Sequence, residues 1–211
     1  MRFITLEGVD GAGKSSHIEF IADAVRTKGL HSIVTREPGG TDLAERLREV
    51  ILGERMPPVL ETLLVFAART DHVARVIRPA LESGTVVICD RFTDATVAYQ
   101  GAGRGFESTL IRDIVQLATG GLMPNLTLLF DLSVAESAVR TRRRVASKNT
   151  DRLDIEDAEF HTRVRNAYLE IAKSQPDRFR VIDARHSTQE THRKVMDIVM
   201  PFLEGRGFLP A

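Results

Sequence analysis

The stretch Gly8-Val9-Asp10-Gly11-Ala12-Gly13-Lys14-Ser15 lies between two segments of different character in this 211-residue chain. Before it, Arg2–Leu6 is short and mostly apolar, as a buried strand would be. After it, Ser15–Lys28 repeats apolar residues every three or four positions until Gly29 ends the pattern, which is typical of an amphipathic helix. The glycine-rich stretch is therefore predicted to be the turn between a strand and a helix.

This turn matches the pattern G-x-x-x-x-G-K-[S/T], in which a loop binds a polyphosphate. Glycines let successive backbone N–H groups face one anion, and the following helix adds the positive end of its dipole. A lysine here can reach the β- and γ-phosphates, and the serine hydroxyl can join a Mg²⁺ shell. A plain glycine turn with an exposed lysine is the alternative. The predicted ATP-binding residues are Gly8, Val9, Asp10, Gly11, Ala12, Gly13, Lys14, Ser15 and Ser16.

Further apolar runs alternate with helical segments along the chain. Continuous apolar character favours parallel strands that are covered on both faces. Strands that alternate with helices predict an α/β fold with a doubly wound, five-stranded parallel sheet. No repeat, low-complexity tract or linker divides the chain, so we expect a single domain over residues 1–211. The predicted strands are Arg2–Leu6, Ser32–Thr35, Val86–Cys89, Leu126–Phe130 and Arg180–Ile182.

Two regions depart from this alternation. A helical insert, Thr41–Leu52 and Val59–Glu82, separates the second and third predicted strands and is divided at Gly53 and the following prolines. Segment 140–152 holds six basic residues against the single acid Asp151. We interpret this segment as a basic lid that closes over an anion, with a solvated helix face as the alternative. Because no aromatic residues interleave with its arginines, a nucleic-acid contact is disfavoured.

The composition excludes several classes of protein. The chain has 29 basic and 29 acidic residues, which argues against a surface that coats nucleic acid or an anionic membrane. Its single cysteine, Cys89, excludes an intrachain disulfide and indicates a reducing, cytoplasmic location. The longest apolar run, Leu63–Ala68, is far shorter than the roughly 20 residues that span a bilayer. The nearest string to a guanine-reading Asn-Lys-x-Asp motif, Ser147–Asp151, does not match it, which disfavours a guanine-nucleotide switch.

Four further strings resemble those of bacterial thymidylate kinases (dTMP kinases), which belong to the P-loop nucleoside monophosphate kinases. In order, they are Arg36-Glu37-Pro38-Gly39-Gly40; Phe66-Ala67-Ala68-Arg69; Asp90-Arg91-Phe92 with Thr96 and Ala98-Tyr99-Gln100-Gly101; and the arginine-rich segment ending in Asp151-Arg152. With the glycine-rich turn, the resemblance covers Arg2 to about Ala184. It implies a homodimeric enzyme that uses ATP and Mg²⁺ to phosphorylate dTMP to dTDP by in-line transfer.

The resemblance also implies roles on the phosphate side. Asp90 and Arg91 follow the third predicted strand, at the sheet edge where open α/β folds bind ligands. Arg91 is expected to hold the dTMP phosphate, with a strand-capping salt bridge as the alternative, and Asp90 to serve as an outer partner of Mg²⁺. Arg36 is expected to contact the same phosphate, and the turn at Pro38 to approach the nucleotide. Asp10 is expected to bond the acceptor 3′-hydroxyl and to interact with Arg36 or a Mg²⁺-bound water.

On the base side, the resemblance implies that Arg69 donates to the pyrimidine O4. Thr96 and Gln100, four apart on one expected helix, would bond the thymine edge, and Tyr99 would exclude a ribose 2′-hydroxyl. Phe66 is the expected stacking ring, with a buried core phenylalanine as the alternative.

The stacking ring departs from the family pattern. Several relatives place it four residues before the arginine, where this chain has Val65. Which of Phe66 and Val65 contacts the base is left open, because one helical position is a rotation of about 100°.

The attacking phosphate oxygen of dTMP is already anionic, so the chemistry requires charge neutralisation rather than a general base. Two unit charges about 4 Å apart repel by roughly 4 kcal/mol at an effective dielectric constant of 20. The predicted catalytic residues are Lys14, Arg91, Asp10, Arg142 and Arg144. Arg185, after the last predicted strand, is expected near adenine. A kinase for another nucleoside monophosphate and a nucleotide-dependent switch without an acceptor are the alternatives.

Overall fold

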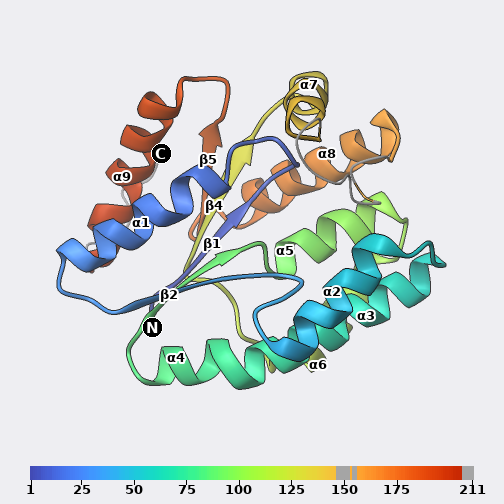
Figure 1. Ribbon diagram of the computed structural model, residues 1–211, viewed down its shortest axis with the longest axis horizontal. Helices are drawn as coiled ribbons and strands as arrows, with labels where there is room; N and C mark the ends of the chain where they lie inside the picture. The colour runs from blue at the N-terminus through green and yellow to red at the C-terminus, as the bar shows by residue number, and fades with distance from the viewer. Residues whose placement is uncertain (146–152, 154–155, 206–211) are drawn as a thin grey trace.

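The computed structural model describes residues 1–145, 153 and 156–205, without the side chains of 143–145. Its centre is a five-stranded sheet with the strand order β2-β3-β1-β4-β5, in which all neighbouring strands pair in parallel (Figure 1). Each predicted strand is confirmed to within one residue at either end. The strands are β1 (Phe3–Glu7), β2 (Ser32–Arg36), β3 (Val86–Asp90), β4 (Leu126–Asp131) and β5 (Phe179–Asp183).

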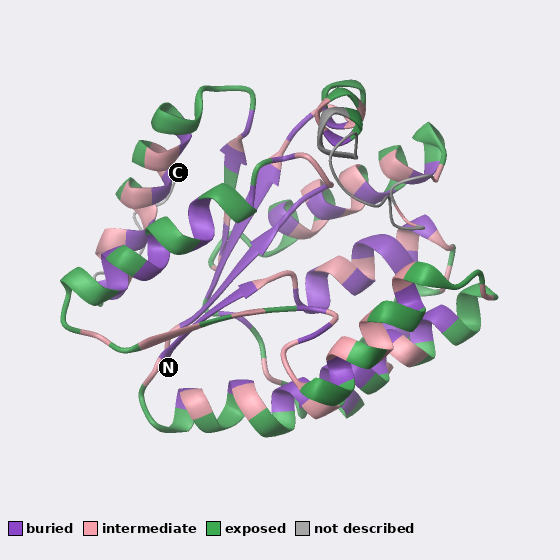
Figure 2. Ribbon diagram, viewed as in Figure 1, coloured by how far each residue is buried: buried purple, intermediate pink, exposed green. Residues whose placement is uncertain are grey.

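Helices cover both faces of this sheet, as the continuous apolar strands require. On one face, α1 (Ser15–Thr27) packs against α9 (Thr188–Leu203) (Figure 1). On the other face, α8 (Ala158–Ser174) packs against strands β4 and β5, and α7 (Val134–Val145) lies near its end. The central strands are buried along nearly their whole length (Figure 2). Among the described helices, none combines the length and hydropathy that crossing a membrane requires.

The helical insert between β2 and β3 is confirmed, with a break at the predicted place. Helix α2 (Asp42–Gly53) is capped by the Thr41 hydroxyl, which accepts a hydrogen bond from Ala44 N–H. Helix α3 (Pro58–His72) starts with a proline at its first turn, where the missing N–H costs nothing. It continues without a stop into the π-helical segment η1 (Val73–Ile77) and α4 (Arg78–Glu82). The insert therefore forms a wall beside the carboxyl ends of β2 and β3.

A second break in α-helical geometry follows β3. Helix α5 (Thr93–Thr96) lasts one turn and continues as the π-helical segment η2 (Val97–Gly103), before α6 (Ser108–Thr119) begins. The predicted helix after Arg91 is thus present, but most of it has π-type geometry. Such segments are rare, and they are frequent at functional sites.

Candidate active site

A cavity of about 690 Å³ opens at the carboxyl ends of β1, β2 and β3. The β1–α1 loop forms one side, the insert helices α2 and α3 form another, and α5 with η2 forms the third. Nearly all of the predicted phosphate-side and base-side residues meet here. Those that line it are Asp10, Gly11, Gly13, Lys14, Ser15, Ser16, Arg36, Pro38, Arg69, Asp90, Arg91, Thr96, Tyr99 and Gln100.

The β1–α1 loop requires glycine where it approaches other backbone. Gly8 has φ of +131°, and a Cβ there would lie 2.3 Å from the carbonyl oxygen of Phe130. Gly11 has φ of +74°, and its Cβ would lie 2.9 Å from the carbonyl oxygen of Ser137. Helix α1 then begins with neither a capping side chain nor an acid in its first turn. Its N–H groups and positive dipole end therefore face the cavity and suit a phosphate.

Lys14 is folded back into this loop. Its Nζ donates to the carbonyl oxygens of Gly8 at 3.0 Å and Val9 at 3.2 Å, and the residue is buried. Burial, followed by repulsion from Arg91, lowers the pKa of Lys14 below its ordinary value. A polyphosphate in the loop would favour the charged ammonium that these two effects disfavour.

Arg91 has an unusual backbone. It is the one non-glycine residue with positive φ, +68°, among the residues that the structure describes. Its own N–H donates to the Leu6 carbonyl at 3.0 Å, and the next N–H, of Phe92, donates to the Glu7 carboxylate at 2.7 Å. Residues in strained backbone persist where their surroundings hold them. Here two contacts from β1 hold the turn that aims Arg91 into the cavity.

The guanidinium of Arg91 joins a cluster of polar groups. It donates to Asp10 at 3.0 Å and to the hydroxyls of Tyr99 and Tyr168, each at 3.1 Å. The Tyr99 hydroxyl in turn donates to the second carboxylate oxygen of Asp10 at 3.1 Å. An anionic phosphate would compete with Asp10 for this guanidinium.

Arg36 has an acidic partner that the sequence did not indicate. Its guanidinium makes a two-point contact with Glu45, at 2.8 and 3.2 Å, and this hydrogen-bonded pair lowers the pKa of Glu45. Glu45 lies in the first turn of α2 and also accepts a hydrogen bond from Gly40 N–H at 2.9 Å, which holds its carboxylate beside Arg36. The expected contact of Asp10 with Arg36 or with a Mg²⁺-bound water stays a prediction, and both residues line the cavity.

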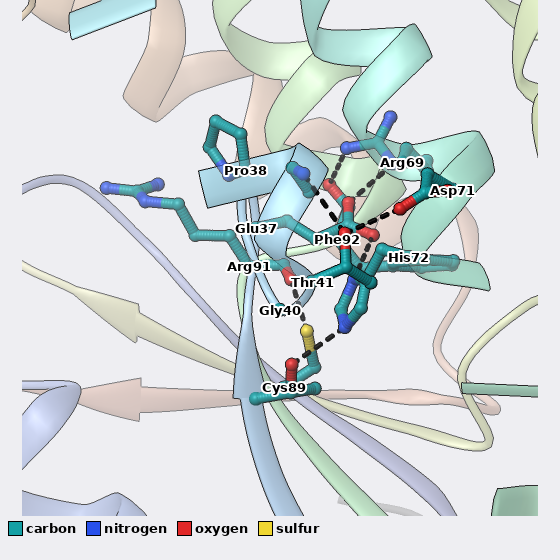
Figure 3. A network of polar contacts seen from close by, with 12 residues as sticks. Glu37, Pro38, Gly40, Thr41, Arg69, Asp71, His72, Cys89, Arg91 and Phe92 are labelled. Atoms are coloured by element: carbon teal, nitrogen blue, oxygen red, sulfur yellow. Dashed lines mark hydrogen bonds and ion pairs between the residues drawn. The ribbon is translucent and has the colours of Figure 1, made fainter. Parts of the chain in front are cut away.

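Arg69 lies at the buried end of the cavity, with 2% of its surface exposed. Its guanidinium donates to Glu37 at 2.6 Å, to the Thr96 hydroxyl at 2.8 Å and to the Phe92 carbonyl at 3.0 Å. The other Glu37 oxygen lies 3.0 Å from Nδ1 of His72. Figure 3 shows Arg69 and His72 converging on Glu37 from the insert. The guanidinium plane is thus fixed before any ligand binds.

Phe66 does not lie on the cavity wall, where a stacking ring is expected. Phe66 packs in a core cluster with Ile111 and Ala118, and its ring centroid lies 5.4 Å from Cζ of Arg69. Val65, one helical position away, lines the cavity, whereas Phe66 does not. The helical rotation between neighbouring positions explains the difference. Phe66 therefore packs against Arg69 on the side away from the cavity.

Of the basic lid, the structure describes only the first part. Arg142 is exposed on α7, and Arg140, two positions earlier, lines the cavity. The predicted Arg144 has its side chain outside the described residues, as does most of segment 140–152. Arg185 is exposed and makes a two-point contact with Asp183 at 2.9 and 2.7 Å, and it does not line the cavity.

Three charged residues among those described around the cavity were not selected from the sequence. Arg140 belongs to the predicted lid, whose composition gave no reason to prefer it over its neighbours. Glu37 belongs to one of the strings that carry the family resemblance, but only the fold shows that it is the partner of Arg69. Arg48 lines the cavity from α2 and donates to the Pro38 carbonyl at 2.9 Å, with no motif to mark it.

The cavity also suits a hydrated Mg²⁺ ion. Oδ1 of Asp90 is buried and has no hydrogen-bond partner among the described residues, although Asp90 lines the cavity beside Ser15. The described residues contain no cluster of three acidic, histidine or cysteine ligands. Mg²⁺ commonly keeps several waters and takes its other oxygens from substrate phosphates and one or two side chains. The predicted pair, Ser15 and Asp90, fits that mode of binding.

A glycine-rich phosphate loop after β1 of a parallel sheet, facing a second polar pocket in the same cavity, defines a P-loop protein of the nucleoside monophosphate kinase class. Comparison with known proteins narrows this class. A family model described as thymidylate kinase matches residues 6–195. The chain belongs to the thymidylate kinase family, and it is therefore a kinase.

Individual relatives agree with this assignment over nearly the whole chain. Thymidylate kinase of Methylobacillus flagellatus is 49% identical over 201 residues, which cover 95% of this chain and 98% of that protein. Thymidylate kinase of Pseudomonas putida is 49% identical over 202 residues, 94% of each chain. The crystal structure of thymidylate kinase from Ehrlichia chaffeensis superposes with a TM-score of 0.77 at 32% identity, covering 94% of this chain and 98% of that one.

Proposed function

We propose that this chain transfers the γ-phosphoryl group of ATP to dTMP, giving dTDP and ADP. The observation that carries the proposal is one cavity that joins a phosphate loop to a buried pocket with fixed hydrogen-bond donors and acceptors. The loop and the N-terminus of α1 suit the donor polyphosphate. The pocket formed by Arg69, Thr96 and Gln100 suits a planar base with polar edges.

Catalysis in this site rests on neutralising charge and aligning two anions. Lys14 leaves the carbonyls of its own loop to contact the donor phosphates, and Arg91 exchanges Asp10 for the acceptor phosphate. Asp10 then becomes available to the 3′-hydroxyl of the deoxyribose. Arg36 and Arg140 line the same cavity and add positive charge around the transferred group.

A bound Mg²⁺ ion, held through Ser15, Asp90 and the donor phosphates, would neutralise charge on the phosphoryl oxygens. The side chains of the protein would supply the binding and the alignment. They bind both nucleotides and hold the attacking oxygen in line with the leaving group, and no general base is required.

The test is the acceptor profile of the purified protein. ADP release, coupled to a spectrophotometric readout with ATP and Mg²⁺ present, is measured with dTMP, dUMP, CMP and AMP. Turnover with dTMP exceeding that with the other acceptors supports the proposal. Turnover with another monophosphate but not with dTMP would reject the base assignment. Slow ATP hydrolysis at a rate that none of the four acceptors changes would indicate a nucleotide-dependent switch instead.

We also propose that the chain forms a homodimer. Helix α3 exposes Val59, Leu60 and Leu63, with 57%, 45% and 55% of their surfaces accessible, and such an apolar strip favours association. Light scattering would give the mass of two chains under this proposal, and the mass of one chain would exclude it.

A further inference from the structure

The orientation of the Gln100 side chain is settled by its partner. Gln100 lines the cavity and is 4% exposed, and its Nε2 donates to Oε1 of Glu61 at 2.8 Å. The oxygen and nitrogen of an amide are told apart by their hydrogen bonds. Because an ionised carboxylate only accepts, the nitrogen of Gln100 must face Glu61. The amide oxygen is then the end of Gln100 that is left for a ligand.

Glu61 is itself held in place. It is fully buried on α3, and Arg104, just after η2, donates to its two oxygens at 2.9 and 3.3 Å. Arg104 also contacts Glu156 at 2.7 Å, and its Cζ lies 4.8 Å from the ring centroid of Phe160. Burial lowers the pKa of Arg104, but the hydrogen bonds that it donates to Glu61 and Glu156, together with the charges of these acids, outweigh this effect and raise it. A permanent cation next to Glu61 favours its ionised, acceptor-only form.

We propose that Glu61 is a positioning residue that fixes the Gln100 amide, so that the pocket presents an oxygen to a ring N3–H and selects thymine over cytosine. The inference deepens the proposed function and rests on it. Glu61 touches neither nucleotide, and it acts only through Gln100.

Arg69 supplies the second half of this selection. Its guanidinium can only donate, and it stands on the same side of the cavity as Thr96. A donor beside an acceptor complements O4 and N3–H of thymine. Cytosine presents the opposite pattern, an amino group and an unprotonated ring nitrogen, so it would meet an unmatched group at both points. A site with fixed polar groups discriminates strongly against a ligand that leaves them unpaired.

The test compares kcat/KM for dTMP and dCMP in Glu61→Gln. An amide at position 61 can donate as well as accept, so the Gln100 amide is free to turn. We expect the preference for dTMP over dCMP to fall by roughly ten- to a hundredfold, with KM for ATP unchanged. Glu54→Gln, at the exposed end of α2, is the matched control and should keep the wild-type preference.

The exchange variant Glu61→Gln/Gln100→Glu separates orientation from structural support. In it, the amide at 61 donates to a carboxylate at 100, which again offers only acceptors to the base. We expect it to recover most of the lost dTMP preference. If Glu61→Gln does not fold, Arg104→Lys, which loosens the hold on Glu61, should shift the preference in the same direction by about threefold.

The outcomes separate this inference from the proposed function. Wild-type protein that does not phosphorylate dTMP overturns both. Wild-type protein that prefers dTMP, together with a folded Glu61→Gln variant of unchanged preference, overturns the inference alone. Equal losses for dTMP and dCMP that the exchange variant does not recover assign Glu61 a purely structural role and also overturn it.

Discussion

The two halves of the cavity are built differently. In the half that we propose to bind the base, which comprises Arg69, Thr96 and Gln100 with their partners Glu37 and Glu61, each side chain is at most 4% exposed and bonds to another part of the chain. In the phosphate-binding half, the cations are more accessible. The side chain of Arg36 is 55% exposed and that of Arg91 is 15% exposed.

The partners differ as well. Arg36 and Arg91 pair with the acids Glu45 and Asp10, and Lys14 bonds to carbonyls of its own loop. Each of these partners occupies a position that a phosphate oxygen could take. In the base-binding half, by contrast, the internal partners orient groups without blocking the face that meets a base.

The chemistry of the ligands explains this division. A base is neutral and is recognised by the direction of a few hydrogen bonds, so a rigid, prearranged pocket suits it. Phosphates carry charge, and several unpaired cations held close together would repel one another before a ligand arrived. Acids that pair with these cations until a phosphate replaces them reduce this repulsion. We therefore expect damage to the phosphate-binding half to slow the chemistry, and damage to the base-binding half to weaken acceptor binding.

The largest effect is expected for Lys14→Ala in the phosphate-binding half. Removing a cation that contacts the transferred group should lower kcat for dTMP by about 10³-fold. The unfolding temperature should change little, because burial and repulsion from Arg91 disfavour the charged ammonium, and relief of that cost offsets the loss of its two carbonyl contacts. Steady-state kinetics with ADP detection, together with thermal unfolding, measure both quantities.

Lys173→Ala, an exposed lysine on α8, is the matched control and should leave kcat unchanged. A Lys14→Ala variant that retains more than about a tenth of the wild-type kcat would show that the loop lysine does not take part in transfer.

A smaller and different effect is expected for Arg69→Lys in the base-binding half. Lysine keeps the charge but not the three-way geometry that joins Glu37, Thr96 and the Phe92 carbonyl. We expect KM for dTMP to rise by about ten- to thirtyfold with kcat lowered less, and stability to fall by about 2 kcal/mol. Acceptor titrations and chemical denaturation test these values.

The control for this variant is Arg75→Lys, since Arg75 is 72% exposed on the same insert and pairs with Asp71 at the surface. It should alter neither KM nor stability measurably. If Arg69→Lys lowered kcat and left KM for dTMP unchanged, the contrast between the two halves would be lost.

Most of the fold could be predicted because its signals are local. Each strand is a short apolar run, and the phosphate loop has a fixed spacing of glycines, lysine and serine. The π-helical segment η2 had no such signal, because it depends on how Val97–Gly103 packs against α6 and α8 rather than on residue spacing.

The site was predicted less completely, because its hydrogen-bond partners come from distant parts of the chain. The partners Glu45 of Arg36 and Arg91 of Asp10 come from other elements, and no motif indicated either pair. The sequence left open which of Phe66 and Val65 faces the cavity, and the helical rotation in the fold places Val65 there and Phe66 in the core. Side-chain pairing across elements is a tertiary property, which a motif in one element does not encode.

The smallest effect on turnover is expected where the two halves meet, at Glu7. This fully buried carboxyl accepts from Phe92 N–H and from the Tyr168 hydroxyl, each at 2.7 Å, and so connects the Arg91 turn to α8. Burial, reinforced by the charge of Asp94, raises the pKa of Glu7 from 4.5 to about 8. The folded protein therefore binds this proton more tightly than the unfolded chain does.

The sign of the pH effect follows from that difference. The stability contributed by protonated Glu7 is complete below about pH 4.5 and is lost as the pH rises through about 8. Like the protonated acid, the amide of Glu7→Gln offers an acceptor to Phe92 N–H and a donor to the Tyr168 oxygen, which reverses the bond that the ionised carboxylate accepts from Tyr168, and it does not titrate. Relative to wild type, it should gain at least about 1 kcal/mol between pH 5 and pH 8.5, with kcat near pH 6 within about threefold.

Denaturant unfolding at several pH values measures this gain, with Glu19→Gln on the exposed face of α1 as the control. Burial lowers the pKa of His17 from 6.5 to about 4. Above about pH 6.5 this residue is neutral in both the folded and the unfolded protein, so it does not alter the pH dependence of stability there. Parallel stability curves for wild type and Glu7→Gln would show that Glu7 is already ionised in the folded protein. Glu7 would then be a carboxylate stabilised by the charge of Arg91. The phosphate-binding half of the cavity would then be more rigid than the exchangeable partners of its cations suggest.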